Sequence, residues 1–415
     1  QAAAVVIDPH TGYIKAMVGG REHKQRLGFN RADQAYRQPG SAFKPIVVYT
    51  AAVDMGYTPA TVVDDSPVSY SAGSGKSWTP KNYTNDYKGL TTIRTAIAKS
   101  VNVVAVKVLN DIGIDRGIEY AQRLGIENLV LTGSKNDRQL SVALGGITKG
   151  VTPLELASAY GTLANSGVHV EPIAVLKVED KSGRVVLENK PNKSVAVSEQ
   201  VAFIMTNMLE SVVKEGTGHR LSSFPYPVAG KTGTTTDDKD VWFVGYTPHL
   251  VAAVWMGHDE PTGMSKVAGG LQPALMWKQI MTEAHQKLPN RNFERPNGIV
   301  GPINICIDSG QLPSELCYKD PRGSRIRGEF FIKGTEPTAF CNVHVQETID
   351  SSTGLLASPF CPLDLVQTRV FIRRPIPYKP SPRGQIPVDA KYEAPTKQCG
   401  LHSSEQLPEQ LPDEQ

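Results

Sequence analysis

Cysteine is missing from the first 305 residues of this 415-residue chain, and the five cysteines all lie in the last third: Cys306, Cys317, Cys341, Cys361 and Cys399. A body without cysteine suits a secreted protein that avoids stray disulfides, although it also arises by chance. Because five is an odd number, at least one thiol is unpaired unless it bonds to another chain.

Long apolar runs and a charge excess are also missing. The longest apolar stretches, such as Ile46–Val53, are far too short to span a membrane. Lysine and arginine (44) nearly balance aspartate and glutamate (41) without a basic block, which argues against nucleic acid as a partner. The chain opens at Gln1 inside a strand-like pattern with no visible signal peptide, so we infer a fragment of a longer polypeptide whose N-terminal part would hold any membrane anchor.

The order of periodic segments predicts an α+β fold. Residues 2–8 and 13–18 indicate a hairpin, and further strands are expected at 228–234, 241–246 and 251–256. Helical patterns lie between them, at 41–55, 91–98, 103–110, from 153 onward and at 198–214, with a last one at 271–287. Strands at both ends predict a central antiparallel sheet in which the terminal strands pair, with helices on both sides.

Composition divides the chain into three parts. Residues 1–290 form the first domain, and the prolines and glycine at Pro296, Gly298 and Pro302 mark a linker. Residues 291–365 form a small cysteine-bearing module with a faint repeat: Ile305–Gly310 with Cys317 is similar to Thr348–Ser351 with Gly354 and Cys361. Residues 366–415, rich in proline from Pro375, predict an extended or disordered tail.

The motif Ser41-Ala-Phe-Lys44 follows a Pro-Gly break and opens an apolar helical run. A serine hydroxyl becomes a nucleophile only when a base removes its proton, and on a helix Lys44 would share a face with Ser41. Lys44 can act as the base only if burial or a second cation lowers its pKa, and Lys231 is the obvious second cation. Ser-x-x-Lys also arises by chance, so the motif alone is weak.

Two later motifs supply complementary groups. Ser100 and Asn102 lie between two helical patterns; Ser100 could relay a proton and Asn102 could hold an amide, although capping a helix is the commoner role of such residues. The strand-like Lys231-Thr232-Gly233-Thr234 gives room for a substrate backbone, a cation for a carboxylate and an N–H for an oxyanion. An ordinary surface strand with a solvated lysine is the alternative.

The three motifs in this order resemble the penicillin-binding protein transpeptidases, specifically the C-terminal half of the bifunctional class A enzymes. The resemblance covers about residues 1–290 and includes Arg37-Gln38-Pro39-Gly40, Leu144-Gly145-Gly146, Glu215-Gly216-Thr217-Gly218 and Trp242-Phe243-Val244-Gly245-Tyr246. The C-terminal module resembles extensions of some Gram-positive class A enzymes. Family members also carry a glycosyltransferase domain and a membrane anchor N-terminal to this region, so the resemblance implies the extracytoplasmic face of the bacterial membrane.

The resemblance implies specific roles. Ser41 would be acylated by the D-Ala-D-Ala end of a peptidoglycan stem peptide, with Lys44 as base and Ser100 as proton shuttle. Asn102 would hold the substrate amide, the terminal carboxylate would meet Lys231, Thr232 and Thr234 beside Gly233, and the N–H groups of Ser41 and Thr234 would form the oxyanion hole. An amine of a second stem would then resolve the ester, and β-lactams would trap Ser41. Cell-wall assembly proteins are further expected partners.

Two other readings of the same motifs remain open. Water could replace the amine, as in a DD-carboxypeptidase or serine β-lactamase, or the chain could be a β-lactam sensor that acylates without turnover. No metal or cofactor is expected. Cys341 and His344 have a ligand-like spacing, but no Cys-x-x-Cys accompanies them, so disulfides or free thiols are favoured over zinc.

Overall fold

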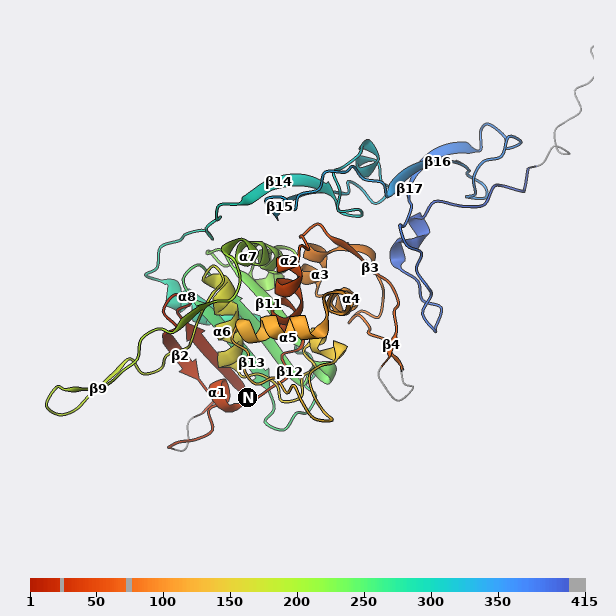
Figure 1. Ribbon diagram of the computed structural model, residues 1–415. Coiled ribbons are helices and arrows are strands. Elements are labelled where there is room, and N and C mark those ends of the chain that lie inside the picture. The colour runs from red at the N-terminus through yellow and green to blue at the C-terminus, as the bar shows by residue number, and fades with distance from the viewer. Residues whose placement is uncertain (23–25, 72–76, 403–415) are drawn as a thin grey trace, which may run out of the picture.

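A five-stranded antiparallel sheet lies at the centre of the computed structural model, which describes residues 1–22, 26–71 and 77–402 (Figure 1). Its strand order is β11-β12-β13-β1-β2. The bounds are β1 (Ala2–Ile7), β2 (Ile14–Val18), β11 (Ala229–Thr234), β12 (Asp240–Tyr246) and β13 (Val251–Gly257). The first strand pairs with β13 in the register Ala3↔Trp255, so the predicted pairing of the two ends of the domain is confirmed.

Both faces of the sheet are buried, because alternate residues of β1 join different hydrophobic clusters. Val5 and Ile7 belong to the larger cluster, and Ala4 and Val6 belong to the smaller one. Helix α8 (Gln272–His285) covers the smaller cluster with Trp277, whose indole N–H donates to backbone carbonyls of β12 and β13. The predicted α+β architecture with helices on both sides is therefore confirmed.

The larger cluster is covered by the remaining helices. Thr152 caps α6 with Glu155 as its capping-box partner, and Ser198 caps α7, as their sequence positions predict. The helices are α1 (Arg31–Gln34), α2 (Thr50–Asp54), α3 (Ile93–Lys99), α4 (Asn102–Ile112), α5 (Ile114–Arg123), α6 (Pro153–Ala164) and α7 (Glu199–Lys214). Residues 91 and 92, expected in a helix, belong instead to strand β6 (Gly89–Thr92).

The helical run expected at 41–55 is irregular at its start. It begins as a 3₁₀ turn over Gly40–Phe43, widens to a π turn over Pro45–Tyr49, and becomes α-helical only in α2. Pro45 has no N–H to donate to the carbonyl of Ser41, so the N–H of Lys44 makes that bond with 3₁₀ spacing. One proline therefore decides how Ser41 and Lys44 are placed.

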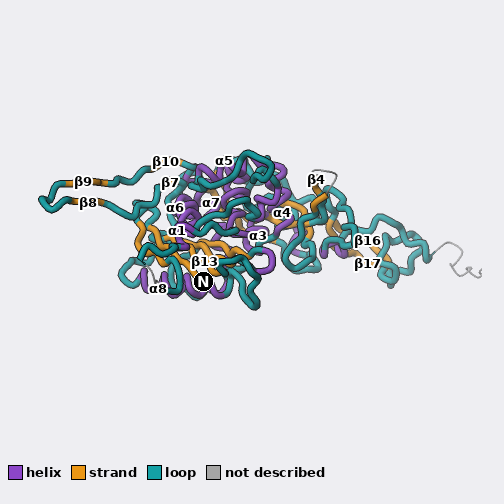
Figure 2. The backbone as a smooth tube through the Cα atoms, turned by 90° about the horizontal axis from the view of Figure 1, so that it is seen from below, coloured by secondary structure: helices purple, strands orange, loops and turns teal. Residues whose placement is uncertain are grey.

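Short two-stranded elements decorate the domain. β3 (Val62–Asp65) pairs with β6, and β6 leads directly into α3. The hairpin of β8 (Lys177–Glu179) and β9 (Val185–Glu188) projects away from the body (Figure 2). The other pairs are β4 (Tyr70–Ser71) with β5 (Ser77–Trp78) and β7 (Val168–Val170) with β10 (Lys193–Val195).

The C-terminal module, residues 295–402, contains two hairpins in tandem. β14 (Ile299–Cys306) pairs with β15 (Ile326–Ile332), and β16 (His344–Asp350) pairs with β17 (Val366–Ile372). The expected boundary at residue 365 is therefore misplaced, since the segment after it is a strand of the module. A 3₁₀ turn follows at Val388–Tyr392, whereas residues 403–415 of the expected tail lie outside the described residues.

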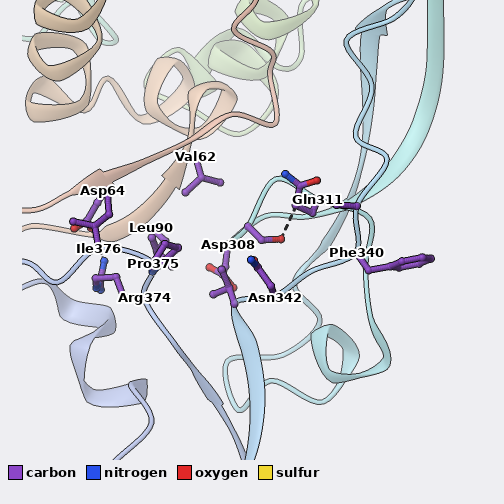
Figure 3. A pocket seen from close by; sticks show the side chains of 13 residues that line it. Val62, Asp64, Leu90, Asp308, Gln311, Phe340, Asn342, Arg374, Pro375 and Ile376 are labelled. Atoms are coloured by element: carbon purple, nitrogen blue, oxygen red, sulfur yellow. Dashed lines mark hydrogen bonds and ion pairs between the residues drawn. The ribbon is translucent and has the colours of Figure 1, made fainter. Parts of the chain in front are cut away.

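Several hydrogen bonds and ion pairs join the module to the first domain. The β14–β15 hairpin crosses over α7 in Figure 1, and there the buried Arg94 of α3 forms an ion pair with Glu329 of β15 at 2.6 Å. Farther along, Arg374 pairs directly with Asp64 of β3, and both residues line a cavity of about 380 Å³ (Figure 3). Among the described residues, no helix is long and apolar enough to cross a membrane.

Candidate active site

A cleft of about 900 Å³ lies along the edge of the sheet, between β11 and the 3₁₀ turn that carries Ser41. Its lining includes Ser41, Asn102 and Thr234, three residues that the sequence assigns to the site. The segments that bear them are separated by up to about half of the chain. The fold therefore brings the first, second and third motifs to one concave surface.

Glycine permits this close approach at two positions. Gly40 has φ +54° and its absent Cβ would lie 2.8 Å from the carbonyl oxygen of Thr234. Gly233 faces the other way, where a Cβ would lie 2.4 Å from the carbonyl oxygen of Pro39. Only glycine at both positions lets the backbone before Ser41 lie directly against β11.

Ser41 is half-buried at the start of its turn, and Lys44 follows one 3₁₀ turn later, on the same side. Helix α6 fixes the position of this turn, because the Tyr160 hydroxyl donates to the carbonyl of Ala42 at 2.7 Å. The sequence pattern gives no sign of this tyrosine, which is 118 residues away in the chain.

Lys44 is completely buried, and its ammonium nitrogen makes three contacts with the second motif. Nζ lies 2.7 Å from the carbonyl of Ser100, 3.4 Å from its Oγ and 2.6 Å from Oδ1 of Asn102. Burial and, to a smaller extent, the nearby charge of Lys231 lower the pKa of Lys44 well below its usual value. Burial therefore favours the neutral amine of Lys44, which is the form that can accept a proton.

Lys231 lies on β11 and is also completely buried. Its Nζ donates to Ser100 Oγ at 2.9 Å and to the carbonyl of Thr232 at 3.1 Å. Burial lowers its pKa from 10.5 to about 7. The alternative of a solvated surface lysine is therefore wrong, because the side chain points into the protein.

Ser100 joins the two lysines, and it does so from an unusual backbone conformation. It ends α3 in the left-handed region, with φ 58° and ψ 38°. A non-glycine residue adopts that conformation only at a cost, and such residues gather at functional sites. Ser100 does not cap the following helix, since the residue that directly precedes α4 is Val101.

Asn102 is the first residue of α4 and not part of a free loop tip. Its side-chain oxygen accepts from Lys44, and its side-chain N–H donates to the carbonyl of Lys81 at 2.8 Å. Both halves of the amide therefore have protein partners in this structure. The assigned role in holding substrate stays a prediction, as do the roles of the other site residues.

A second asparagine, missed in the sequence, completes the start of α4. The side-chain oxygen of Asn82 accepts the N–H groups of Asn102 and Val103 at 2.9 and 3.2 Å, in the place of a helix cap. Its own side-chain N–H donates to both carboxylate oxygens of the buried Asp65 at 2.9 Å. No local motif marks Asn82, because Asp65 and the two N–H groups of α4 lie 17 to 21 residues away from it.

The third motif is fixed by neighbours on both sides. Thr232 lies 2.7 Å, oxygen to oxygen, from Thr217, which belongs to the Glu215–Gly218 segment noted in the sequence. The hydroxyl of Thr234 accepts the N–H of Gly269 at 3.2 Å. These bonds orient the two threonine side chains on either side of Gly233.

The segment before Ser41 is anchored by a buried cation. Arg37 donates to Asp240 of β12 at 2.8 Å, and its guanidinium lies over the Trp255 ring at 4.9 Å from the ring centre. The indole N–H of Trp255 donates to the same carboxylate. A charged residue nine-tenths buried needs this full set of partners, so the loop that presents Ser41 has little freedom.

The family description "Penicillin binding protein transpeptidase domain" matches residues 2–282. The chain belongs to the penicillin-binding protein transpeptidase family. A second description, "Penicillin-binding protein 1A, C-terminal domain", matches residues 295–346. Members of the transpeptidase family are serine acyltransferases, so the resemblance seen in the three motifs is confirmed at that level.

Curated relatives and solved structures agree with this assignment. "Penicillin-binding protein 1A" of Clostridium botulinum (strain Hall) is 41% identical over 384 residues, which are 90% of this chain and 45% of the relative. The chain thus spans about half the length of the curated relatives it matches. The crystal structure of "Penicillin-Binding Protein 1A from Haemophilus influenzae" is similar with a TM-score of 0.71, at 29% identity over 82% of this chain and 54% of that one. "PonA1 protein from Mycobacterium Tuberculosis in complex with penicillin V" has a TM-score of 0.63, at 28% identity over 72% and 81% of the two chains.

Proposed function

We propose that this cleft is a peptidoglycan D,D-transpeptidase site in which Ser41 forms the acyl-enzyme. The observation that carries the proposal is the convergence of two buried lysines on the Ser100 hydroxyl, beside the cleft that Ser41 lines. Family membership supplies the general class of serine acyltransferase, and the contacts support the roles proposed for individual residues. The complex of PonA1 with penicillin V supports β-lactams as inhibitors of this site.

In the first half-reaction, Ser41 Oγ attacks the carbonyl carbon of the penultimate D-Ala while its proton passes to the neutral amine of Lys44. The N–H groups of Ser41 and Thr234 are the expected donors to the oxyanion. The C–N bond then breaks, the terminal D-Ala leaves as an amine, and Ser100 passes it the proton from Lys44. The product is an ester between Ser41 and the shortened stem.

In the second half-reaction, the amine of another stem peptide attacks the same ester carbon and its proton passes to Lys44. Collapse breaks the C–O bond, returns the proton to Ser41 and leaves a new amide cross-link. Lys231, with the hydroxyls of Thr232 and Thr234, would hold the terminal carboxylate of the donor. Asn102 would turn its amide from its present partners to the substrate peptide bond. Cell-wall assembly proteins and the extracytoplasmic face of the membrane are the setting proposed for the whole protein.

The decisive experiment supplies the chain with a D-Ala-D-Ala donor peptide and an amine acceptor, and separates the products by mass. Cross-linked amide supports the transpeptidase. Shortened free acid as the sole product, even at high amine concentration, would assign the site to a carboxypeptidase. A stable penicillin adduct without any peptide turnover would assign it to a β-lactam sensor, and rapid hydrolysis of penicillin to a β-lactamase.

The nucleophile is tested by labelling with a fluorescent penicillin. Ser41→Ala should remove all labelling while the melting temperature stays within a few degrees. Ser182→Ala, an exposed serine on the β8–β9 hairpin, is the control and should label as the parent chain does. Peptide mapping that finds the adduct on any other serine would refute the assignment.

A further inference from the structure

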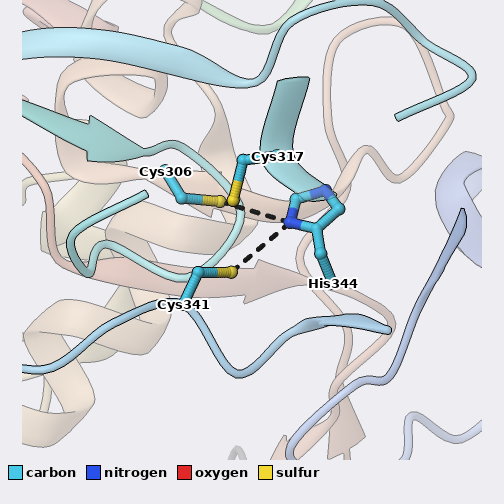
Figure 4. A group of neighbouring side chains, drawn as sticks. All are labelled: Cys306, Cys317, Cys341 and His344. Carbon is cyan, nitrogen blue, oxygen red and sulfur yellow. Dashed lines mark hydrogen bonds between the residues drawn. The ribbon is translucent and has the colours of Figure 1, made fainter. Parts of the chain in front are cut away.

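Three cysteines and one histidine meet in the C-terminal module, far from the cleft (Figure 4). The sulfur atoms of Cys306, Cys317 and Cys341 and a ring nitrogen of His344 all lie within 4.8 Å of one another. The contributing segments are the end of β14, the 3₁₀ turn at Glu315–Tyr318 and the start of β16. Three of the four residues are buried and Cys341 is half-buried.

The donor set and its spacing fit a tetrahedral zinc ion. His344 directs Nδ1 to the sulfur atoms of Cys306 and Cys341, at 3.5 and 3.4 Å. Zinc bonds of about 2.3 Å to sulfur and about 2.0 Å to nitrogen give a tetrahedron with edges of roughly 3.3 to 3.8 Å. Four protein ligands leave no open position, which is typical of a structural ion and not of a catalytic one.

Groups behind the ligands are arranged as they are around zinc. The far ring nitrogen of His344 lies 2.8 Å from the carboxylate of Asp320, which would fix Nδ1 as the unprotonated, ligating nitrogen. Asp320 is itself held by Arg322 at 2.6 Å. The N–H of Ser314 points at the sulfur of Cys317 at 3.4 Å, a bond that stabilises a thiolate. Asp308 and Asp320 therefore act as partners of ligands and not as ligands.

Disulfides do not explain the cluster. All five cysteines are free, and a disulfide between any two of the three would leave the third sulfur and the histidine without a function. The module also has only a small apolar core: beyond residue 290, the buried aliphatic and aromatic side chains are Ile299, Ile305, Phe331, Val343, Ile349 and Ile372. Small units without a sizeable core are usually held by disulfides or metals.

The same arrangement occurs a second time, forty-four positions later. Five positions are identical when 305–317 is aligned with 349–361: Ile305, Gly310, Leu312, Ser314 and Cys317 match Ile349, Gly354, Leu356, Ser358 and Cys361. The faint repeat expected from the sequence already has this register at Gly310 and Cys317, which match Gly354 and Cys361. In this alignment Asp350 takes the place of Cys306. Outside the aligned segments, Cys399-x-x-His402 follows the second unit as Cys341-x-x-His344 follows the first.

Backbone bonds confirm that the two units share one geometry. In the first unit, the backbone N–H of Cys306 donates to the carbonyl of Gln311. In the second unit, the backbone N–H of Asp350 donates to the carbonyl of Leu355. The N–H of Cys341 donates to the carbonyl of Leu312 at 2.7 Å, and that of Cys399 to the carbonyl of Leu356 at the same distance. The N–H of Ser358 points at the sulfur of Cys361 at 3.3 Å, as that of Ser314 does in the first unit.

The second unit also gathers a complete ligand set. One atom each from Asp350, Cys361, Cys399 and His402 lies within 4.8 Å of the others. Nδ1 of His402 is 2.7 Å from Oδ2 of Asp350 and 3.6 Å from the sulfur of Cys399. The other oxygen of Asp350 accepts the N–H of Ser352, which orients the carboxylate.

We propose that residues 295–402 are two tandem zinc-binding units, the first with three cysteines and a histidine and the second with an aspartate, two cysteines and a histidine. Each ion holds a strand end, a turn and a distant Cys-x-x-His segment together. The sequence did not reveal them, because the ligands of each site come from segments up to 52 residues apart whose spacing follows no short zinc motif.

The first test is the zinc content of the purified chain by elemental mass spectrometry after dialysis against buffer without chelator. About two zinc ions per chain are expected. Cys341→Ala and Cys399→Ala should each remove about one, and His219→Ala, an exposed histidine outside the module, should remove none. A ratio of about one that Cys341→Ala abolishes and Cys399→Ala leaves unchanged would overturn the second site alone; zinc below one tenth per chain would overturn both.

The second test does not depend on any variant folding. The unmodified chain is unfolded with chelator and without reductant, and its thiols are counted by alkylation and intact mass. Five alkylated cysteines support metal ligation, whereas fewer indicate disulfides and overturn the proposal. In the folded chain, the same thiols should resist alkylation until a chelator is added. Penicillin labelling of Ser41, followed on the same samples, reports separately on the cleft.

Cobalt identifies the ligand classes. The chain stripped of zinc and refilled with Co²⁺ should show the visible bands of tetrahedral cobalt and a near-ultraviolet band from thiolate ligands. Cys399→Ala should retain the bands of the three-thiolate site, and Cys341→Ala those of the weaker two-thiolate site. Weak bands of octahedral cobalt in the unmodified chain would refute both ligand sets.

Discussion

Lys44 and Lys231 face one another across the Ser100 hydroxyl, with Nζ atoms 3.4 and 2.9 Å from its Oγ. Both side chains are completely buried, so each lysine disfavours a positive charge on the other. One proton shared between two amines and one hydroxyl is the simplest way to satisfy this arrangement. The Ser100 side chain thereby links Lys44, one turn after Ser41, with Lys231 of β11.

The first prediction concerns the pH dependence of acylation by penicillin. Toward acid pH the second-order rate constant should fall, because Lys44 takes up a proton and stops acting as base. Above about pH 7 it should fall again, because Lys231, whose pKa burial lowers to about 7, loses the charge that attracts the carboxylate. Stopped-flow or quenched labelling between pH 5 and 10 measures both limbs.

The control for the alkaline limb is Lys231→Arg, since a guanidinium stays charged throughout that range. In this variant the decline above neutral pH should disappear, whatever the absolute rate. A rate constant of the unmodified chain that keeps rising to pH 10 would mean that Lys231 is not the cation in question.

The second prediction separates chemistry from stability at Lys44. Lys44→Met keeps the volume and removes a buried amine, so acylation should slow by about 10² to 10⁴, as expected for loss of a positioned base. The melting temperature should hold or rise, because burying an amine opposes folding. Calorimetry and penicillin labelling on the same preparation measure the two effects. Equal losses of folding and labelling would instead indicate a structural role.

The third prediction tests the contact between the two glycine-bearing segments. Gly233→Ala would place a methyl group 2.4 Å from the carbonyl of Pro39 and 3.1 Å from the Cβ of Ala42. The loop that bears Ser41 must move, so stability should fall by about 1 to 3 kcal/mol and labelling should largely cease. Denaturant unfolding and fluorescent penicillin provide the readings.

A matched glycine makes this test specific. Gly161 lies inside α6, where an added methyl group meets nothing nearer than 3.8 Å. Gly161→Ala should therefore leave labelling unchanged and hold or raise stability, since alanine favours a helix. A similar loss of labelling in both variants would show that the close approach at β11 is not what matters.

The fourth prediction concerns Asn82, which caps α4 from another part of the chain. Asn82→Ala leaves the N–H groups of Asn102 and Val103 without their acceptor, and should cost about 1 to 2 kcal/mol. Because Asn102 contacts Lys44, acylation should also slow. Asn192→Ala removes an asparagine hydrogen bond at the surface and should change neither quantity by a measurable amount.

Much of the first domain follows from local sequence. The alternation in Ala2–Ile7 and in 251–256, and the caps at Thr152 and Ser198, locate strands and helices because both the pattern and its cause are local. The three motifs identify the cleft for the same reason. Local sequence does not reveal the residues that support the site from behind, which are Asn82, Tyr160 and Asp240. Their hydrogen-bond partners at the site are distant in the chain, and their neighbours in sequence form no recognisable motif.

The last part of the chain shows the same limit more strongly. The prolines from Pro375 onward led us to predict an extended or disordered tail at 366–415. Within that range, however, β17 and the Cys399-x-x-His402 segment belong to the module. We propose that metal ligands, more than apolar side chains, hold this part of the chain together. Its strands therefore show little apolar periodicity from which to predict them. A repeat is visible in the sequence, but the rest of each ligand set lies outside it, in the segments 341–344 and 399–402.

The ion pair between Arg94 and Glu329 has a consequence for how the chain can be divided. Family boundaries separate residues 282 and 295, as if the two parts were independent. Yet Arg94 lies on α3, the helix that delivers Ser100, and its carboxylate partner is supplied from across that boundary. A fragment that ended between the two would leave the buried guanidinium of Arg94 without its carboxylate partner, on the helix that ends at Ser100. The module follows the first domain in the linear sequence, but in three dimensions it supplies a buried ion-pair partner to the helix that ends at Ser100.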